Sequence, residues 1–146
     1  MSTSDAMDAV QAALAAEHAA VYGYGVVGGR IGDDREAEAT AAYASHRARR
    51  DALRRTVRDL GGKPVAAAPA YALPFPVPDQ AAAVRLATAL EDRVAGVYSD
   101  VVRAAEGPLR REAASALREA AVRAVRWRGN GVAFPGLTER TEGPAR

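Results

Sequence analysis

The amino-acid sequence predicts an all-α protein, a four-helix bundle in which a long proline-rich crossover joins the second and third helices. Two observations predict this fold. Apolar residues recur three and four positions apart in four separate stretches, which is the spacing of one face of an α-helix. Between the second and third stretches, residues 62–78 (GKPVAAAPAYALPFPVP) hold five of the eight prolines. Proline fixes φ and removes a backbone donor, so this segment cannot be helical.

The length of the proline-rich segment decides how the helices are oriented. Its seventeen residues, at about 3.1 Å each in polyproline geometry, reach about 50 Å. A helix of about 25 residues is only about 38 Å long. The segment can therefore run the whole length of a helix, and the second and third helices can be parallel. A short turn would instead make them antiparallel.

The first two helices are expected before this segment. The first covers about residues 5–28, with Ser4 or Asp5 as its cap. The second covers about residues 34–60, and a Gly-Gly pair follows each helix. The sequence GYGVVG at 23–28 also matches the GxGxxG dinucleotide fingerprint. That fingerprint needs a strand before it and a helix after it. A helical pattern precedes these glycines, so we expect them to allow close helix packing and then to end the helix.

The last two helices follow the crossover. The third is expected after the cap Asp79, and the fourth has Pro108 in its first turn and ends near the glycines at 129 and 131. We expect residues 132–137 (VAFPGL) to fold back over one end of the bundle. One domain is thus expected over residues 1–137, followed by a disordered polar tail at 138–146.

Composition excludes several classes of protein. The chain has no cysteine, which excludes disulfides, thiolate catalysis and cysteine-ligated metals. It has no signal segment and no apolar run of membrane-spanning length, so we expect a soluble, cytoplasmic protein without membrane contact. The formal net charge is only +2, and the arginines alternate with acidic residues at helical spacing. This pattern indicates solvated helix faces, and a nucleic-acid partner is not expected.

Four polar residues interrupt the apolar stripes near the helix midpoints: Glu17, His46, Glu91 and Glu119. The midpoints of bundled helices of similar length lie at one level, so these groups can converge on one central spot. Buried carboxylates and imidazoles need partners. The spot is therefore either a metal site or a buried polar network. In a network, an arginine such as Arg50 or Arg126 would neutralise the carboxylates. As metal ligands, the four residues would suit iron or manganese.

Five segments resemble the bacterial ferritin-like proteins grouped as a domain of unknown function: AAEHAAVYGYGVVG, HRARRDAL, YALPFPVPD, ALEDRVAGVY and EAAVRAVRWRG. The resemblance covers roughly residues 6–137 and implies a ferritin-like four-helix bundle, a dimer, and no established activity. Ferritin-like dimetal sites use two Glu-x-x-His pairs. This chain has Tyr43-Ala-Ser-His46 and Glu119-Ala-Ala-Val122 in their place. One carboxylate and one histidine are missing.

These observations lead to two hypotheses about function. We expect a degenerate, non-catalytic bundle that acts as a structural or interaction module, forms a homodimer, and has no catalytic residue and no cofactor. The alternative is a metal-binding oxidoreductase or iron-handling protein. It would use Glu17, His46, Glu91 and Glu119 as the ligands of a reduced iron or manganese site.

Two further expectations concern residues outside this spot. His18 is expected at the surface or at an interface. The apolar side chains of the crossover are expected to pin it to the bundle; they are Tyr71, Leu73, Phe75 and Val77.

Overall fold

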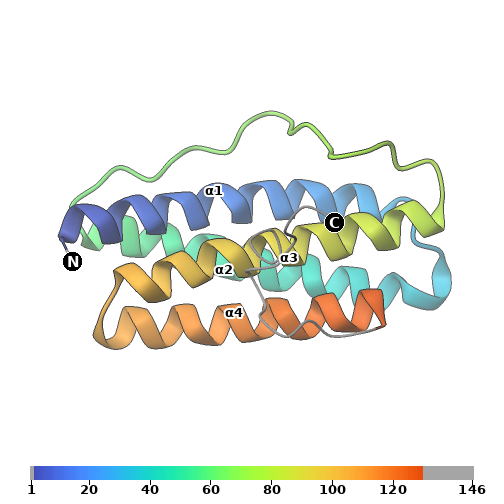
Figure 1. Cartoon of the computed structure of the whole chain (residues 1–146). Coiled ribbons are helices and arrows are strands. Elements are labelled where there is room, and N and C mark those ends of the chain that lie inside the picture. Colours follow the sequence, from blue (N-terminus) through green and yellow to red (C-terminus); the bar gives the residue numbers. More distant parts are fainter. Residues whose placement is uncertain (1, 130–146) are drawn as a thin grey trace, which may run out of the picture.

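The computed structural model describes residues 2–129, and this part of the chain forms four α-helices, one 3-10 turn and no strand. Figure 1 shows the helices packed side by side as a bundle. They are α1 (Thr3–Gly28), α2 (Glu36–Asp59), α3 (Gln80–Ala104) and α4 (Gly107–Arg128), with the 3-10 turn η1 (Asp33–Arg35) before α2. The expected fold-back at 132–137 and the expected tail at 138–146 lie outside the described residues.

The helix ends follow local chemistry. The Asp79 cap of α3 is confirmed, because its Oδ1 accepts the backbone N–H of Ala82 at 2.9 Å. The expected cap of α1 was wrong: Ser2 caps it, and its Oγ accepts the Asp5 N–H at 3.1 Å. The Asp5 carboxylate accepts the Ser2 N–H in return, at 3.3 Å. This reciprocal pair is a capping box, which starts the helix two residues earlier than expected.

The helices form two antiparallel hairpins, α1 with α2 and α3 with α4, and α1 packs against α3. Figure 1 shows that the segment between α2 and α3 runs the length of the bundle beside α1, so that α2 and α3 point in the same direction. We call residues 62–78 of this segment the strap. None of the helices within residues 2–129 is both long enough and apolar enough to cross a membrane.

Hydrogen bonds from side chains of α1 to the backbone of the strap fix the position of its first residues along the helix. Gln11 donates to the carbonyl of Lys63 at 2.6 Å and accepts the N–H of Val65 at 2.9 Å. His18 Nε2 lies 3.0 Å from the Val65 carbonyl, and the carbonyl can only accept, so Nε2 is the donor. His18 was expected at the surface or at an interface, and the first of these positions is wrong, because its side chain is only 4% exposed. The strap covers it.

The second half of the strap is pinned by apolar contacts, as expected. The ring of Tyr71 packs on that of Tyr22, with 5.8 Å between the centroids. Leu73, Phe75 and Val77 pack against buried residues of the bundle.

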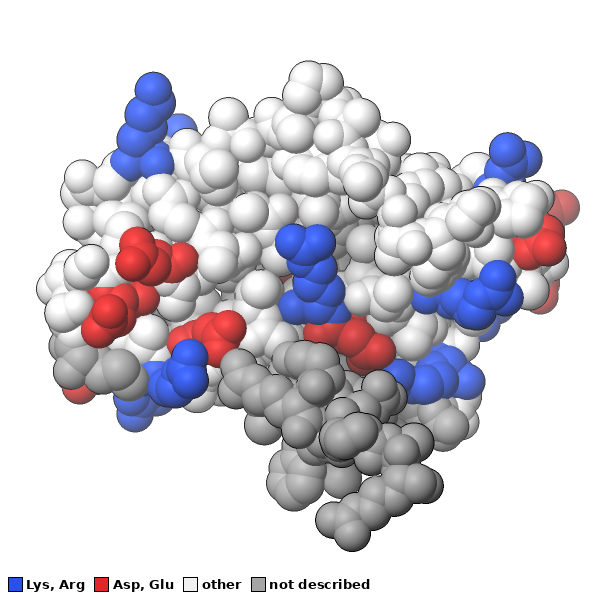
Figure 2. All heavy atoms as spheres, turned by 45° about the horizontal axis from the view of Figure 1, so that its top comes forward, with Lys and Arg blue, Asp and Glu red and all other residues white. Residues whose placement is uncertain are grey.

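Figure 2 shows the face that carries the strap, where positive and negative side chains are interspersed around a broad uncharged area. This mixed pattern is the one expected of solvated helix faces.

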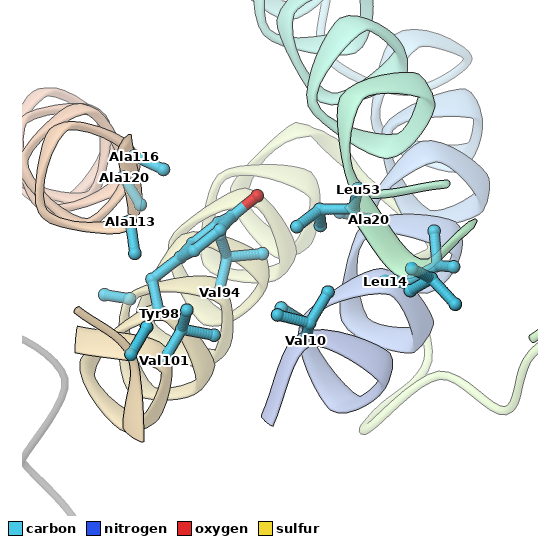
Figure 3. Packing of buried hydrophobic residues seen from close by; sticks show 14 residues of the cluster. Val10, Leu14, Ala20, Leu53, Val94, Tyr98, Val101, Ala113, Ala116 and Ala120 are labelled. Carbon is cyan, nitrogen blue, oxygen red and sulfur yellow. The ribbon is translucent and has the colours of Figure 1, made fainter. Parts of the chain in front are cut away.

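The buried apolar side chains form two clusters, one toward each end of the bundle. In α2 and α3 the boundary between the clusters falls at His46 and Glu91. Figure 3 shows the first cluster, where Tyr98 of α3 lies between α4 and the α1–α2 hairpin. The α4 side chains that face this ring are small: Ala113, Ala116 and Ala120.

The GxGxxG match lies inside a helix. Since α1 continues unbroken to Gly28, no strand precedes these glycines. Gly23 packs directly on α3: a Cβ added there would lie 2.5 Å from Cδ1 of Leu90. Gly25 faces open space, with no atom within 4 Å of an added Cβ. The expected close packing is therefore confirmed at Gly23 and does not extend to Gly25.

Candidate functional site

Three of the four polar residues from the helix midpoints meet in the core. Glu17 of α1 and Glu91 of α3 are 0% exposed, and His46 of α2 is 1% exposed. The imidazole lies between the two carboxylates. His46 Nδ1 is 2.6 Å from Oε2 of Glu17, and His46 Nε2 is 2.7 Å and 3.0 Å from the two carboxylate oxygens of Glu91. One histidine thus joins three helices.

Aromatic residues complete the hydrogen bonding around these three side chains. The Tyr98 hydroxyl donates to Oε1 of Glu17 at 3.0 Å, and the Tyr24 hydroxyl donates to Oε2 of Glu91 at 3.1 Å. Tyr24 accepts in turn from the indole N–H of Trp127, at 3.0 Å. We call this set the His46 network: Glu17, Tyr24, His46, Glu91, Tyr98 and Trp127. Within the described residues, every buried side-chain nitrogen and oxygen has a hydrogen-bond partner.

The network fixes the protonation state of His46. Each ring nitrogen faces a carboxylate oxygen, which can only accept, so both nitrogens carry a proton. Burial alone would lower the pKa of His46. The hydrogen bonds and negative charges of Glu17 and Glu91 outweigh burial and raise the pKa to about 9. His46 is therefore a cation at neutral pH. The Tyr24 ring stacks on it, with 5.4 Å between the centroids.

The two tyrosines stay protonated. Burial raises the pKa of Tyr24, and the negative charge of Glu91 raises it further. Burial and the charge of Glu17 raise the pKa of Tyr98 in the same way. Both hydroxyls are therefore fixed donors toward the carboxylates across the physiological pH range.

The arginine that neutralises the second carboxylate is Arg123 of α4. Its Nη1 lies 3.6 Å from Oε1 of Glu91, and its Nη2 donates to the Ser45 hydroxyl. The expectation of Arg50 or Arg126 was wrong. Arg50 pairs with Asp51 at the surface, at 3.0 Å, and Arg126 is exposed on α4. A helix turns by about 100° per residue, so Arg123 and Arg126 point about 60° apart, and only Arg123 is aimed between α2 and α3.

Glu119 does not join the other three residues. It lies beside the buried stripe of α4, and its side chain is 44% exposed. Its carboxylate is 2.8 Å from Arg49 Nη2 and 3.9 Å from Arg123 Nη2. Glu119 therefore belongs to a chain of surface ion pairs that bridges α2 and α4. Arg123 connects this chain to the core.

Sequence reasoning missed Arg123, and although it expected Tyr24 and Tyr98 to pack in the core with satisfied hydroxyls and Trp127 to lie on the apolar face of the fourth helix, it did not identify their hydrogen-bond partners. One signal was present: Tyr24 follows Glu17 by seven residues, and Tyr98 follows Glu91 by seven. Two helical turns place each pair on one face. Trp127 had a weaker signal. It is the only tryptophan of the chain, and a buried indole needs a partner for its N–H.

The network does not fit a metal ion in this arrangement. In this arrangement both nitrogens of His46 carry protons, so a metal ion would have to displace one of them before the imidazole could ligate it. Tyr43 and Val122 stand where a dimetal site would have a carboxylate and a histidine, and Tyr43 packs beside Arg47 instead. Within residues 2–129, no group of three or more acidic, histidine or cysteine side chains is arranged to hold a metal.

Comparisons with known proteins show a similarity to a solved structure and to a protein family. The chain is similar to the crystal structure of a conserved hypothetical protein, rv2844, from Mycobacterium tuberculosis. The two share 36% sequence identity with a TM-score of 0.86, over 88% of this chain and 98% of that one. Among the curated proteins, none matches. A family model described as a domain of unknown function (DUF4439) matches residues 9–139. The chain therefore belongs to the DUF4439 family.

Proposed function

We propose that the chain is a ferritin-like bundle whose core holds an ionic network in place of a metal centre. In this proposal it acts in the cytoplasm, as a homodimer, and serves as a non-catalytic structural or interaction module. The ferritin-like assignment is supported by the parallel α2 and α3 and by the strap along α1. One long crossover of this kind is the connection that ferritin-like bundles use. The lack of cysteine is compatible with the cytoplasm.

The observation that carries this proposal is the position of His46 between Glu17 and Glu91, at 2.6 and 2.7 Å. The imidazolium supplies the positive charge that a metal ion would otherwise bring to two buried carboxylates. Arg123 supplies the second positive charge, so that two negative and two positive groups balance. A balanced and fully hydrogen-bonded cluster leaves no group free to bind or activate a substrate. Such clusters can instead fix the register of the helices that they join.

The competing function is the binding of iron or manganese by Glu17, His46, Glu91 and Glu119. The donor types favour it, since two buried carboxylates and one imidazole make a mixed oxygen and nitrogen set. It would require His46 to lose a proton and to move away from a carboxylate. It would also require Glu119 to leave Arg49.

Elemental analysis of untagged protein after anaerobic addition of Fe²⁺ or Mn²⁺ separates the two functions. We expect no retained metal and a lower unfolding midpoint for His46→Ala. His18→Ala is the matched control, because it removes the other histidine of the chain from outside the network. Near-stoichiometric metal that is lost in both Glu17→Ala and His46→Ala, but kept in His18→Ala, would reject the proposal.

A further inference from the structure

The outer face of the α3–α4 hairpin carries an apolar groove of about 550 Å³. Its floor is built from small and branched apolar side chains of both helices: Ala95, Ala114, Leu117, Ala121 and Val125. Three large hydrophobic side chains are exposed within the described residues, and two of them, Val122 at 40% and Val125 at 38%, line this groove. Exposed apolar area gathered in one place is typical of an interaction surface.

The groove reaches the point where the chain leaves α4. Its lining on α4 extends from Ala114 to Arg128, which is the last residue of the helix. Gly129 follows with a φ of 90°, in the left-handed region, and donates its N–H to the Val125 carbonyl at 2.7 Å. A glycine in this conformation ends the helix, and an apolar contact with the last turns often accompanies it. The chain after Gly129 therefore starts beside the groove.

The sequence after Gly129 supplies an apolar segment. Residues 130–138 (NGVAFPGLT) carry no charge, and the first large apolar side chains in them are Val132 and Phe134. Alternate residues of an extended chain point to the same side, so these two side chains can face one surface together. Pro135 and Gly136 follow, a pair that favours a turn. This segment lies outside the described residues.

We propose that residues 132–134 occupy the groove of their own chain and run back along α4. The lengths agree. From Gly129 to Phe134 an extended chain spans about 16 Å at roughly 3.3 Å per residue, and the helix from Arg128 back to Leu117 spans about 16 Å at 1.5 Å per residue. Phe134 then comes level with Leu117, and Val132 comes level with Ala121.

The connection to α4 favours this segment over a second copy of the chain. Only residues 130 and 131 separate it from the end of the helix, and a tether this short gives an effective concentration on the order of millimolar. The charges also suit an uncharged segment. Asp92 and Arg128 pair with each other across the near end of the groove, at 3.1 Å. Arg118 and Arg126 are exposed, so their guanidinium groups can stay in water while their stems line the groove.

Disulfide formation in the full chain tests this placement, because the sequence has no cysteine of its own. We expect Ala121→Cys with Val132→Cys to form a bond within one chain under mild oxidation at micromolar concentration. Val65→Cys with Val132→Cys is the matched control, since Val65 is 39% exposed but lies on the strap. It should react at least about tenfold more slowly. Non-reducing electrophoresis separates a bond within one chain from a bond between two chains.

Two outcomes of this experiment would overturn the proposal. A bond between chains in the Ala121 and Val132 pair would assign the groove to a second copy. Equal rates for the two pairs would mean that Val132 has no fixed position on α4. The proposal does not depend on the homodimer or on the ionic core of the proposed function, so either result leaves those standing.

Removal of the Phe134 ring gives an independent measurement. We expect Phe134→Ser to lower the unfolding midpoint and to raise the fluorescence of a dye that binds apolar surface several-fold, because the groove becomes open. Thr138→Ser, beyond the apolar run, is the control and should change neither. The effect of Phe134→Ser should shrink in a Leu117→Ala background, because both changes remove the same contact. An unchanged midpoint and dye signal, or an equal effect in both backgrounds, would reject the proposal.

Discussion

The hydroxyl of Tyr98 donates a hydrogen bond to Glu17 at 3.0 Å, from α3 to α1. A second bond runs in the opposite direction, from Tyr24 of α1 to Glu91 of α3, at 3.1 Å. In each helix the tyrosine follows the glutamate by seven residues, and α1 and α3 are antiparallel. Each tyrosine therefore reaches the glutamate of the other helix. His46 lies between the two glutamates and completes the pairing.

The protonation of His46 should make stability depend on pH. Its pKa is about 9 in the folded chain and 6.5 for the unperturbed side chain. Between these values the folded state binds the extra proton, so the free energy of unfolding should fall as pH rises. The stabilisation is fully present below pH 6.5 and is lost as pH passes through about 9. The difference is on the order of 3 kcal/mol, at 1.36 kcal/mol for each pKa unit.

Urea unfolding at several pH values from 6 to 9.5 measures this dependence. His46→Gln provides the reference, because glutamine does not titrate and the remaining groups are unchanged. We expect the free energy of unfolding of the wild type to decrease across this window relative to the variant. Equal slopes for the two proteins would mean that His46 does not carry the extra proton in the folded state.

Removal of the two tyrosine hydroxyls should have unequal effects. Tyr98→Phe leaves one buried oxygen of Glu17 without a donor, which costs about 1–3 kcal/mol. Tyr24→Phe deprives both the Glu91 carboxylate and the Trp127 N–H of a partner. We therefore expect Tyr24→Phe to lower the free energy of unfolding more than Tyr98→Phe. Chemical denaturation at pH 7 measures the free energy of unfolding of both variants and of the wild type. A larger loss for Tyr98→Phe would contradict the hydrogen-bond pattern.

The sequence predicted the helices because their signals are local. Apolar spacing, the Asp79 cap, Pro108 and the glycines after α1, α2 and α4 act within a few residues, and the bounds expected for the first two helices lie within two residues of those of α1 and α2. The meeting of Glu17, His46 and Glu91 was also predictable. Each interrupts an apolar stripe near its helix midpoint, and bundle geometry brings midpoints to one level.

The partners of these residues were harder to predict, because they depend on how α4 is rotated about its axis. The buried stripe of α4 is mostly alanine, so apolar spacing alone does not distinguish the inward position of Arg123 from the outward positions of Glu119 and Arg126. His18 was misplaced for a different reason. It is buried by the strap, which has no regular secondary structure and whose path over α1 leaves no periodic signal.

The positions of Glu17 and Glu119 predict different costs for their removal. Glu17→Ala leaves the buried imidazolium of His46 with one carboxylate partner instead of two, and loss of one member of a buried ionic group costs about 3–5 kcal/mol. Glu119→Ala removes a pair with Arg49 that solvent screens, because the Glu119 side chain is 44% exposed. We expect a cost below about 1 kcal/mol for Glu119→Ala. Thermal and urea denaturation of the two variants measures the difference. Comparable costs would place Glu119 in the core.

The glycines of α1 allow a matched test of packing between α1 and α3. A Cβ at Gly23 would lie 2.5 Å from Cδ1 and 2.8 Å from Cδ2 of Leu90, so Leu90 must move to accept Gly23→Ala. Overpacking of this kind costs about 1–3 kcal/mol. Gly25 has no neighbour within 4 Å of an added Cβ, so Gly25→Ala should instead gain about 0.5–1 kcal/mol of helix propensity.

The two glycine variants add the same methyl group to the same helix, two residues apart. Only the contact with α3 differs between them. Urea denaturation at pH 7 should therefore give free energies of unfolding that change in opposite directions, lower for Gly23→Ala and higher for Gly25→Ala. If Leu90 instead adopts another rotamer at little cost, Gly23→Ala should change the free energy of unfolding of the wild type by about as much as it changes that of the Leu90→Ala variant. If the clash is real, trimming Leu90 should make Gly23→Ala neutral or stabilising in that background.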